Sequence, residues 1–408
     1  MSKLDQLLQG VEVEWKTLGE VMKVLRGKRL TRDMLSPEEK YAVFHGGLEP
    51  LGFYSRYNRP AHTVMIINVG ASAGTVGYSD VKFWSSDGCF CLEHSEALND
   101  KFLYYFLIGK QHFLKSRVRV AGIPTLDNFV VERLQIPIPP LPVQQEIVRI
   151  LDRFTELTAE LTAELTARKK QYGFYREQLL SFEDGVVEWK MLGEVGELVR
   201  GNGLPKADFT ESGIPAIHYG QIYTYYKTFT KETKSFVSPE TAKKLRKVNY
   251  GDVVITNTSE NLEDVGKAVV YLGKEQAVTG GHATIFKPSK LIEGKFFAYF
   301  TQTETFANQK RKYAKGTKVI DVSTTDMAKI KIPIPSPEEQ ARIVSILDKF
   351  DTLTTSISEG LPKEIEQRKK QYEYYREQLL TFPLSAGNKD YTKNHQNSNH
   401  SKNHNSDQ

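Results

Sequence analysis

Clusters of lysine and arginine are the side chains whose types and spacing most clearly suggest chemistry in this chain of 408 residues. They lie near both ends of a first stretch, residues 26–119, and again at 243–247 and 310–318, and residues 305–320 contain no acid. Basic runs interleaved with tyrosine and glycine suit neutralisation of a nucleic-acid backbone. A solvated face is the competing interpretation, and the matching late runs weigh against it. The candidate contacts are Arg26, Arg29, Arg117, Arg119, Lys310, Arg311, Lys312 and Lys318.

Recognisable signatures of catalysis are missing from the sequence. There is no G-x-x-x-x-G-K-[ST] phosphate loop, and Pro139-Pro140 lacks the flanking residues of an amino-methyltransferase site. The glycine-rich stretch at 70–74 predicts a turn rather than a nucleotide loop. A single histidine in an apolar run, His282, is expected to be a satisfied core residue. The sequence therefore predicts no catalytic residue, no metal and no cofactor in this chain.

Composition predicts a globular protein of two or three domains. Hydrophobic residues make up 39% of the chain and charged residues 26%, which excludes wholesale disorder. The first residues lack the apolar core of a signal peptide and no run approaches 18 apolar residues, so we expect a cytoplasmic protein without a membrane partner. The two cysteines, Cys89 and Cys91, cannot form a disulfide framework or a four-ligand zinc site, and packing is their expected role. The net charge of +5 permits a nucleic-acid partner.

Three blocks of sequence occur twice in the same order, which identifies a tandem duplication. The stretches between the blocks diverge, and this combination indicates one shared partner and two different targets. The blocks are VEWKTLGEV and VEWKMLGEV (13–21 and 187–195, each followed by Arg-Gly), IPIP leading into IVRILDRF and IVSILDKF (136–154 and 332–350), and a final block identical at 12 of 15 positions (168–182 and 368–382). Fainter echoes pair Phe102, Tyr105 and Phe106 with Phe296, Tyr299 and Phe300, and Val76-Gly77 with Val265-Gly266.

Apolar residues after each IPIP recur in steps of three and four, which predicts two long helices. The first, at 143–182, would be a rod of about 60 Å. The second, at 338–382, contains Gly360-Leu361-Pro362, which should kink or restart it. Because an apolar stripe of this length needs a partner, we expect the helices to pack as a coiled coil. The candidate packing or docking residues are Leu151, Phe154, Leu161, Tyr172, Tyr175, Leu179, Leu347, Phe350, Tyr372, Tyr375 and Leu379.

The divergent stretches have the pattern of α+β modules. Short apolar runs at 64–69, 253–256 and 268–272 predict strands, and residues 101–115 and 294–312 predict a helix late in each module. The polar end of the chain predicts disorder. Its three histidines, His395, His400 and His404, could hold a metal weakly, although an inert tail is the expectation.

The repeated blocks resemble those of the specificity (S) subunits of type I restriction–modification enzymes over residues 11–382. The tract TELTAELTAELTA at 155–167, followed by RKKQY, points to the branch whose spacer helix carries variable tetrapeptide repeats. The resemblance implies two target-recognition domains, each reading one half of a split DNA site. It also implies two docked methyltransferase subunits, which use S-adenosylmethionine to methylate adenine, and ATP- and magnesium-dependent restriction subunits.

The resulting prediction is an α+β fold with an internal pseudo-two-fold repeat, in which two globular domains are separated by an antiparallel coiled coil of two long helices. Between Phe154 and Arg168 lie 13 residues, and between Phe350 and Arg368 lie 17. The difference of one helical turn, about 6 Å, matches the TAEL unit and predicts a ruler for the gap between half-sites. The predicted segments are target-recognition domain 1 (1–140), spacer helix 1 (141–183), target-recognition domain 2 (184–336), spacer helix 2 (337–382) and a disordered tail (383–408).

Two other classes of protein stay open at this point. One is a self-sufficient DNA-modifying enzyme, against which the missing methyltransferase and nuclease motifs count. The other is a coiled-coil scaffold whose divergent modules grip two proteins. DNA binding that falls steeply with salt would separate the specificity subunit from the scaffold.

Overall fold

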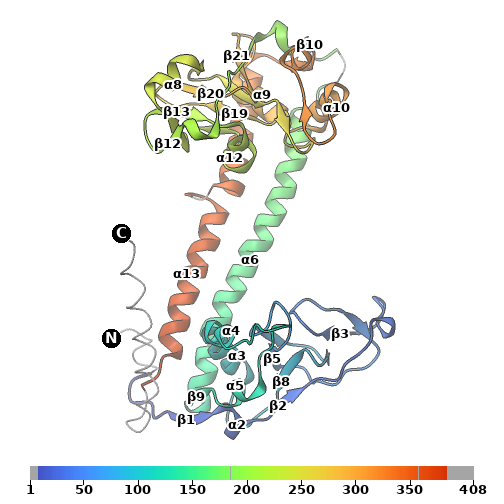
Figure 1. Ribbon diagram of the computed structural model, residues 1–408, viewed down its shortest axis with the longest axis vertical. Helices are drawn as coiled ribbons and strands as arrows, with labels where there is room; N and C mark the ends of the chain where they lie inside the picture. The colour runs from blue at the N-terminus through green and yellow to red at the C-terminus, as the bar shows by residue number, and fades with distance from the viewer. Residues whose placement is uncertain (1–7, 184, 357, 384–408) are drawn as a thin grey trace. The chain divides into compact units, whose positions relative to one another are not determined.

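The computed structural model describes residues 8–183, 185–356 and 358–383, and the chain divides into two units (Figure 1). Unit 1 comprises Met1–Glu160 with Glu366–Gln408, and unit 2 comprises Leu161–Ile365. Each unit thus contains one domain, the first part of the helix that follows it and the last part of the other repeat's helix. The boundaries predicted between the recognition domains and the spacer helices, at residues 140/141, 183/184 and 336/337, stay a prediction. The tail after Pro383, with its three histidines, lies outside the described residues.

The domain of unit 1 contains a four-stranded sheet in the order β2-β8-β5-β6 and a three-stranded sheet in the order β4-β3-β7. The strands are β1 (Glu14–Thr17), β2 (Val24–Arg26), β3 (Tyr41–Phe44), β4 (Gly52–Tyr54), β5 (Thr63–Ile67), β6 (Val76–Ser79), β7 (Trp84–Ser85), β8 (Cys89–Leu92) and β9 (Gln135–Ile138). The helices are α2 (Leu18–Val21), the 3₁₀ turn η1 (Arg32–Met34), α3 (Asp100–Gly109), α4 (Gln111–Ser116), α5 (Asn128–Glu132) and the long α6 (Leu141–Leu179), which continues into unit 2.

The domain of unit 2 contains two five-stranded sheets, in the orders β11-β21-β17-β19-β14 and β12-β15-β13-β20-β16. The strands are β10 (Glu188–Met191), β11 (Gly196–Arg200), β12 (Phe209–Thr210), β13 (Ile214–Ile217), β14 (Phe229–Thr230), β15 (Ser235–Val237), β16 (Arg246–Val248), β17 (Val253–Thr256), β18 (Thr258–Ser259), β19 (Ala268–Tyr271), β20 (Ala277–Thr279), β21 (Ala283–Pro288), β22 (Ile320–Asp321) and β23 (Lys331–Ile334). The helices are η2 (Leu192–Glu194), η3 (Lys206–Asp208), α7 (Tyr219–Thr224), α8 (Pro239–Lys244), α9 (Gly294–Phe300), α10 (Glu304–Tyr313), α11 (Thr324–Met327), α12 (Pro337–Thr355) and α13 (Leu361–Leu380), whose last part belongs to unit 1.

The two domains share one topology, which fulfils the prediction of an α+β repeat. The series β2-β8-β5-β6 corresponds to β11-β21-β17-β19, and β4-β3-β7 corresponds to β15-β13-β20. In both domains the first repeated block forms an antiparallel pair with IPIP, which places Trp15 opposite Pro137 and Trp189 opposite Pro333. A proline is tolerated there because each pair is a two-stranded sheet with free edges. The predicted strands at 64–69, 253–256 and 268–272 are β5, β17 and β19.

The helix predictions are confirmed in part. Two helices replace the single one predicted late in each module, with breaks between α3 and α4 and between α9 and α10. The second break arises because Thr303 caps α10, its hydroxyl accepting the N–H of Phe306 at 3.3 Å. The expected interruption of the second long helix is present, because α12 ends at Thr355 and α13 begins at Leu361. Gly360 adopts φ +80° in this break, a conformation that favours glycine.

An antiparallel helix pair supports each domain, as the fold prediction required. In unit 1, α6 leaves the domain and α13 returns to it (Figure 1). The rings of Phe154 and Tyr375 on these helices stack 5.1 Å apart. In unit 2, the ring of Phe350 on α12 stacks against Tyr172 and Tyr175 of α6, at 6.0 and 5.6 Å. Offset stacking of this kind adds about 0.5–1.5 kcal/mol to the burial of each ring.

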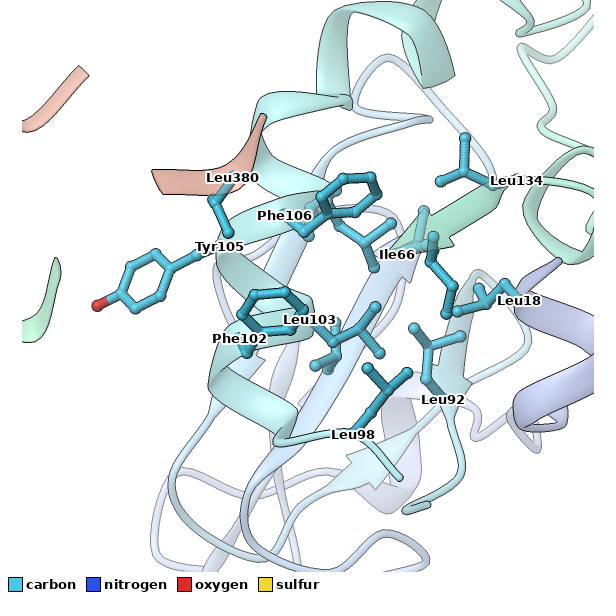
Figure 2. Packing of buried hydrophobic residues seen from close by; sticks show 14 of the residues in the cluster. Leu18, Ile66, Leu92, Leu98, Phe102, Leu103, Tyr105, Phe106, Leu134 and Leu380 are labelled. Atoms are coloured by element: carbon cyan, nitrogen blue, oxygen red, sulfur yellow. The ribbon is translucent and has the colours of Figure 1, made fainter. Parts of the chain in front are cut away.

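The core of unit 1 shows how the domain is tied to its helices. Figure 2 shows Phe102, Leu103 and Phe106 of α3 packed over Ile66 of β5, while Tyr105 points the other way. The Tyr105 hydroxyl donates to Asp152 of α6 at 2.6 Å. Burial, and after it this carboxylate, raises the pKa of Tyr105, so the phenol stays a hydrogen-bond donor. Unit 2 repeats the arrangement with Tyr299 and Asp348 at 2.7 Å. A lysine completes each set, Lys101 at 3.0 Å from Asp152 and Lys295 at 2.6 Å from Asp348.

A buried glutamine at the start of each long helix joins it to the preceding domain. The side chain of Gln144 is fully buried, and its Oε1 accepts the N–H of Asn99 at 2.8 Å. Its Nε2 donates to the carbonyl oxygens of Ala97 and Pro139, at 3.0 and 2.7 Å. Gln340 makes the equivalent three hydrogen bonds in unit 2, with Glu293, Leu291 and Pro335. In both glutamines the oxygen and the nitrogen of the side-chain amide form hydrogen bonds with backbone groups. These backbone groups would otherwise lack partners at the junction.

Lys310 does not lie where a nucleic-acid contact would need it. Its side chain is 6% exposed, and its ammonium donates to the carbonyl oxygen of Val265. The neighbouring Gly266 makes room for it, since a Cβ there would lie 2.8 Å from Cδ of Lys310. Burial, and after it the charges of Lys267 and Arg311, lowers the pKa of Lys310 to about 8. We therefore remove Lys310 from the candidate contacts.

We predict that Gln144→Leu lowers the free energy of unfolding of the chain by about 2–4 kcal/mol, because it leaves an N–H and two carbonyl groups buried without partners. The matched control is Gln145→Leu, which changes an exposed neighbour and should alter stability by less than about 0.5 kcal/mol. Chemical denaturation of both variants measures the difference. Equal stability of the two variants would show that the buried amide does not hold the helix to the domain.

A second prediction concerns the pH dependence of stability. Since a lysine in an unfolded chain has a pKa of about 10.4, the folded chain binds fewer protons than the unfolded chain between pH 8 and 10.4. Stability of the wild type should rise with pH over this window, by roughly 1–3 kcal/mol from Lys310. Lys310→Met should abolish this rise, whereas Lys312→Met, at an exposed neighbour, should keep it. Denaturation at pH 7.5, 8.5 and 9.5 tests both statements, and identical slopes in the two variants would contradict them.

Candidate nucleic-acid interface

An arginine lies at the same end of the sheet β2-β8-β5-β6 in unit 1 and of the sheet β11-β21-β17-β19-β14 in unit 2. We call this end of each sheet the arginine end. Arg26 is the last residue of β2 and Arg200 the last residue of β11. Each Nε donates to a backbone carbonyl of the turn that precedes the neighbouring strand, Arg26 to Asp87 and Arg200 to Gly281, at 3.1 Å in both cases. Both side chains are exposed. In Arg200 a second guanidinium nitrogen, Nη2, also lies 3.4 Å from a carboxylate oxygen of Asp321. A guanidinium has five N–H donors, so each arginine keeps donors beyond those that the protein holds.

The glycine after each arginine is required by close packing of backbone. A Cβ on Gly27 would lie 2.2 Å from the carbonyl oxygen of Ser85, and one on Gly201 would lie 2.1 Å from that of Gly280. Any side chain at these positions would displace the turn that accepts the arginine hydrogen bond. The Arg-Gly pair that follows VEWKxLGEV in both repeats therefore builds the arginine end.

A short hairpin with basic residues also lies at the arginine end, and we call residues 117–125 and 313–321 the basic hairpins. In unit 1 the backbone of Arg119 and Thr125 exchanges two hydrogen bonds, of 2.9 and 3.0 Å. In unit 2 Lys315 and Asp321 do the same, at 2.9 and 2.8 Å. Each hairpin contains a glycine in the left-handed region, at 122 with φ +82° and at 316 with φ +103°.

Each basic hairpin is attached to the loop that leaves the central strand of its sheet. The N–H of Leu126 donates to the carbonyl of Asn68 at 2.8 Å, and the N–H of Val322 donates to that of Asn257 at 3.0 Å. Asn68 directly follows β5, and Asn257 directly follows β17. An ion pair adds to each attachment, Arg119 with Asp127 at 2.9 Å and Lys315 with Asp326 at 3.1 Å.

The loop after the central strand contains a glycine in both domains, and the structure changes which two glycines correspond. Gly266 has φ +77° and its N–H donates to the carbonyl of Thr256, one residue before Asn257. In unit 1 Gly74 has φ +84° and its N–H donates to Ile67, one residue before Asn68. The counterpart of Gly266 is therefore Gly74, and the predicted pairing with Gly77 is wrong. Loops of different length between the same anchors shifted the apparent match.

The two arginine ends carry different side chains beside the same backbone. In unit 2 the ring of His282 lies 4.9 Å from Tyr219, which lies 4.6 Å from His218. Nδ1 of His282 is 2.9 Å from the hydroxyl of Thr258. His282 is exposed, so its expected core position is wrong. Burial, and after it the charge of His282, lowers the pKa of His218, which favours a neutral ring at neutral pH.

Unit 1 has no histidine at the position of His282. Since Cys89 pairs with Ile67 as Ala283 pairs with Thr256, the counterpart of His282 is Gly88. The ring of His45 fills this space, because a Cβ on Gly88 would lie 2.7 Å from its Nδ1. The same nitrogen lies 3.3 Å from a carboxylate oxygen of Asp87. The two domains therefore present different hydrogen-bonding groups at equivalent places.

Most basic candidates lie where a ligand could reach them. Arg26, Arg29, Arg117 and Arg119 are exposed in unit 1, and Arg311, Lys312 and Lys318 are exposed in unit 2. The guanidinium of Arg117 lies 5.0 Å from the ring centre of Phe113, and a guanidinium nitrogen of Arg311 donates to Asn308 at 2.6 Å. Arg26, Arg117, Arg119 and Lys318 belong to the arginine end or a basic hairpin.

Two residues of the same set were not among the candidate contacts, although both lie in runs that the sequence singled out. Arg200 and Lys315 occupy the places of Arg26 and Arg119. The Arg-Gly repeat after VEWKMLGEV already pointed to Arg200. Nothing in the sequence pointed to Lys315 in preference to its neighbours, because the two hairpins share no residues at matching positions.

The helix candidates line the antiparallel pairs. Leu151, Leu347 and Leu379 are fully buried, and Tyr172 is nearly so. Phe154, Leu161, Leu179, Phe350, Tyr372 and Tyr375 are half-buried. Tyr175 is 37% exposed although its ring stacks on Phe350. The rings of Tyr105 and Tyr372 lie 6.2 Å apart, which connects the first domain to the end of α13.

The described ranges contain no cluster of metal-binding side chains. Within them, no three histidine, cysteine or acidic side chains gather as a metal site would require. Cys89 and Cys91 are buried beside Met65, Ile67 and Phe83, as expected for packing residues. Of the helices in the part of the chain that the structure describes, none is long and apolar enough to cross a membrane.

Comparison with known proteins gives a consistent family. Residues 10–168 and 186–367 each match the family model described as the type I restriction modification DNA specificity domain. The specificity subunit of the Escherichia coli type I restriction enzyme EcoR124I/EcoR124II is 35% identical over 405 residues, which cover 94% of this chain and 98% of that protein. A putative type I restriction enzyme specificity subunit from Haemophilus influenzae is 34% identical, with 93% and 98% covered.

Solved structures agree on the fold. The crystal structure of the type I restriction–modification S subunit from M. genitalium has a TM-score of 0.60 at 19% identity, covering 94% of this chain and all of that chain. A chain from a structure of complex assembly and conformational transition in the type I R-M system has a TM-score of 0.58 at 17% identity, with 92% and 99% covered. The chain thus belongs to the specificity subunits of type I restriction–modification systems, the non-catalytic components that recognise the DNA target.

Proposed function

We propose that this specificity subunit binds double-stranded DNA at an asymmetric site made of two half-sites and an unread gap. The arginine end of each domain contacts one half-site. The observation that carries the proposal is one backbone framework presented twice with different side chains, His218, Tyr219 and His282 in unit 2 and His45 and Asp87 in unit 1. Side chains that differ at equivalent places favour different bases, whereas shared arginines suit the phosphates.

The proposal extends to two methyltransferase subunits docked on the repeated helices. Two exposed aromatic rings support it: Phe174 is 63% exposed and Tyr374 is 60% exposed, at matching positions of the final repeated block. The same surface group presented by both repeats favours two copies of one partner. The methyltransferase subunits would supply S-adenosylmethionine chemistry on adenine, and restriction subunits would supply ATP- and magnesium-dependent cleavage. The chain itself contributes DNA recognition and assembly.

The branch of the family with TAEL spacer repeats is also part of the proposal. The tract lies within the uninterrupted helix α6, where Leu157, Leu161 and Leu165 recur every four residues and are half-buried. Threonine, alanine and glutamate of the tract are almost all exposed. Such a segment adds length with little effect on specific packing, which suits a spacer.

Mapping of adenine methylation across the host genome, with and without this gene, tests the proposed function. We expect one asymmetric, gapped motif to lose its methylation when the gene is deleted and to regain it on complementation. The purified complex should bind a duplex carrying this motif with an affinity that falls steeply with salt. An unchanged methylome together with salt-independent binding would contradict DNA recognition and favour a protein scaffold.

A second prediction concerns the spacer. Insertion of one TAEL unit into residues 155–167 lengthens α6 by about 6 Å and should widen the gap of the methylated motif by one or two base pairs, each of about 3.4 Å. Both half-sites should keep their sequences, because the domains are unchanged. Replacement of one unit by another tetrapeptide of equal length is the control and should leave the gap as it was. A gap that stays constant in the insertion variant would exclude the ruler.

A further inference from the structure

Each basic hairpin exposes aliphatic side chains next to its cations. Val120 is 80% exposed and Ile123 is 70% exposed in unit 1, and Val319 is 59% exposed in unit 2. A single exposed aliphatic residue is ordinary in a folded protein. Here, however, an exposed aliphatic residue recurs at a matching position of two hairpins whose sequences otherwise differ. Ile123 lies four residues after Arg119, and Val319 lies four residues after Lys315.

The hairpins hold these side chains on a fixed base. The backbone hydrogen bonds at Arg119 and Lys315, and the ion pairs of both residues, close the base of each hairpin. Hydrogen bonds to Asn68 and Asn257 then attach the base to the sheet. A side chain presented in this way loses little further entropy when it inserts into a partner.

Charge identifies the kind of partner. Residues 101–126 contain no acid, and neither do residues 305–320. An exposed cation is close in sequence to the aliphatic residues of each hairpin, since Arg117 lies three residues before Val120 and Lys318 directly precedes Val319. A polyanion with an apolar interior is complementary to this combination, and stacked bases between phosphates are such a structure. Proteins that deform DNA insert aliphatic side chains between base steps while cations hold the adjacent phosphates.

We propose that the basic hairpins are wedges, in which Val120 and Ile123 enter a base step of one half-site and Val319 enters a base step of the other. This inference rests on the proposed DNA binding and adds to it the way in which the bases are contacted. The flanking cations fix the hairpin on the backbone, and the aliphatic side chains separate neighbouring bases. Each half-site therefore contains a step that is unstacked in the complex.

Fluorescence of 2-aminopurine measures the unstacking directly. The probe is a duplex carrying the gapped motif found by methylation mapping, with 2-aminopurine placed singly at each half-site position other than the methylated adenine. The protein is the full chain assembled with its methyltransferase subunits. We expect fluorescence to rise severalfold at one step in each half-site. In the double variant Val120→Ser with Ile123→Ser the rise should vanish in one half-site only, and in Val319→Ser in the other only.

Affinity and salt dependence separate the wedge from the cations. The serine variants should bind the duplex about tenfold more weakly with an unchanged salt slope, the scale of a lost base contact. Lys318→Gln should reduce the slope by about 0.9 and keep the fluorescence rise. The matched control is Val81→Ser, since Val81 is 65% exposed and follows β6 at the opposite end of the sheet. It should behave as wild type.

The outcomes distinguish the wedge from DNA binding as such. If wild type binds with a steep salt dependence but no position gains fluorescence, the wedge is excluded and DNA recognition stands. If the serine variants assemble poorly with the methyltransferase subunits and keep the fluorescence rise, the hairpins dock protein and the wedge is again excluded. If wild type fails to bind the duplex, the proposed function itself fails. Because the substituted residues are exposed, unchanged thermal unfolding should accompany every variant.

Discussion

The burial of polar groups where each long helix leaves its domain is the constraint on which the rest of the structure depends. Gln144 and Gln340 satisfy backbone groups on both sides of this junction. About two helical turns later, Asp152 and Asp348 each bind a tyrosine and a lysine. A hydrogen-bonded network with all members satisfied permits one geometry, whereas apolar contacts alone tolerate rotation. The direction in which each domain faces is therefore coupled to its helix, and a recognition surface on the domain inherits that coupling.

Each repeat contributes the end of its long helix to the core of the other repeat's domain. The core of unit 1 contains Leu379, Leu380 and Phe382 from the end of the second repeat, and unit 2 contains Leu179, Leu180 and Phe182 from the end of the first. Each domain is thus completed by the helix end of the other repeat. The two copies of the final block are nearly identical because each copy makes the same contacts, the first with the domain of unit 2 and the second with the domain of unit 1.

The arginine ends show the complementary principle, in which a fixed backbone carries variable side chains. Gly27 and Gly201 allow the turn, Asn68 and Asn257 hold the hairpin, and neither task depends on the bases to be read. Side chains between these anchors are free to change. The contrast between Gly88 beside His45 in one domain and His282 beside Tyr219 in the other illustrates how two targets can be addressed by one architecture.

Much of this organisation follows from the sequence alone. The tandem repeat, the two helical stripes, the break at Gly360, the central strands and the family membership were all accessible, because periodicity and repeated motifs are local properties. The sequence did not show which residues within the basic runs are buried and which are exposed. Lys310 and Arg311 are neighbours with the same charge, yet only the packing of α10 against the loop around Val265 turns the first inward and leaves the second in solvent. Likewise, His282 is exposed and Lys315 matches Arg119 only because strands distant in sequence bring their turns to one end of a sheet. Such choices depend on contacts between segments, which local pattern does not encode.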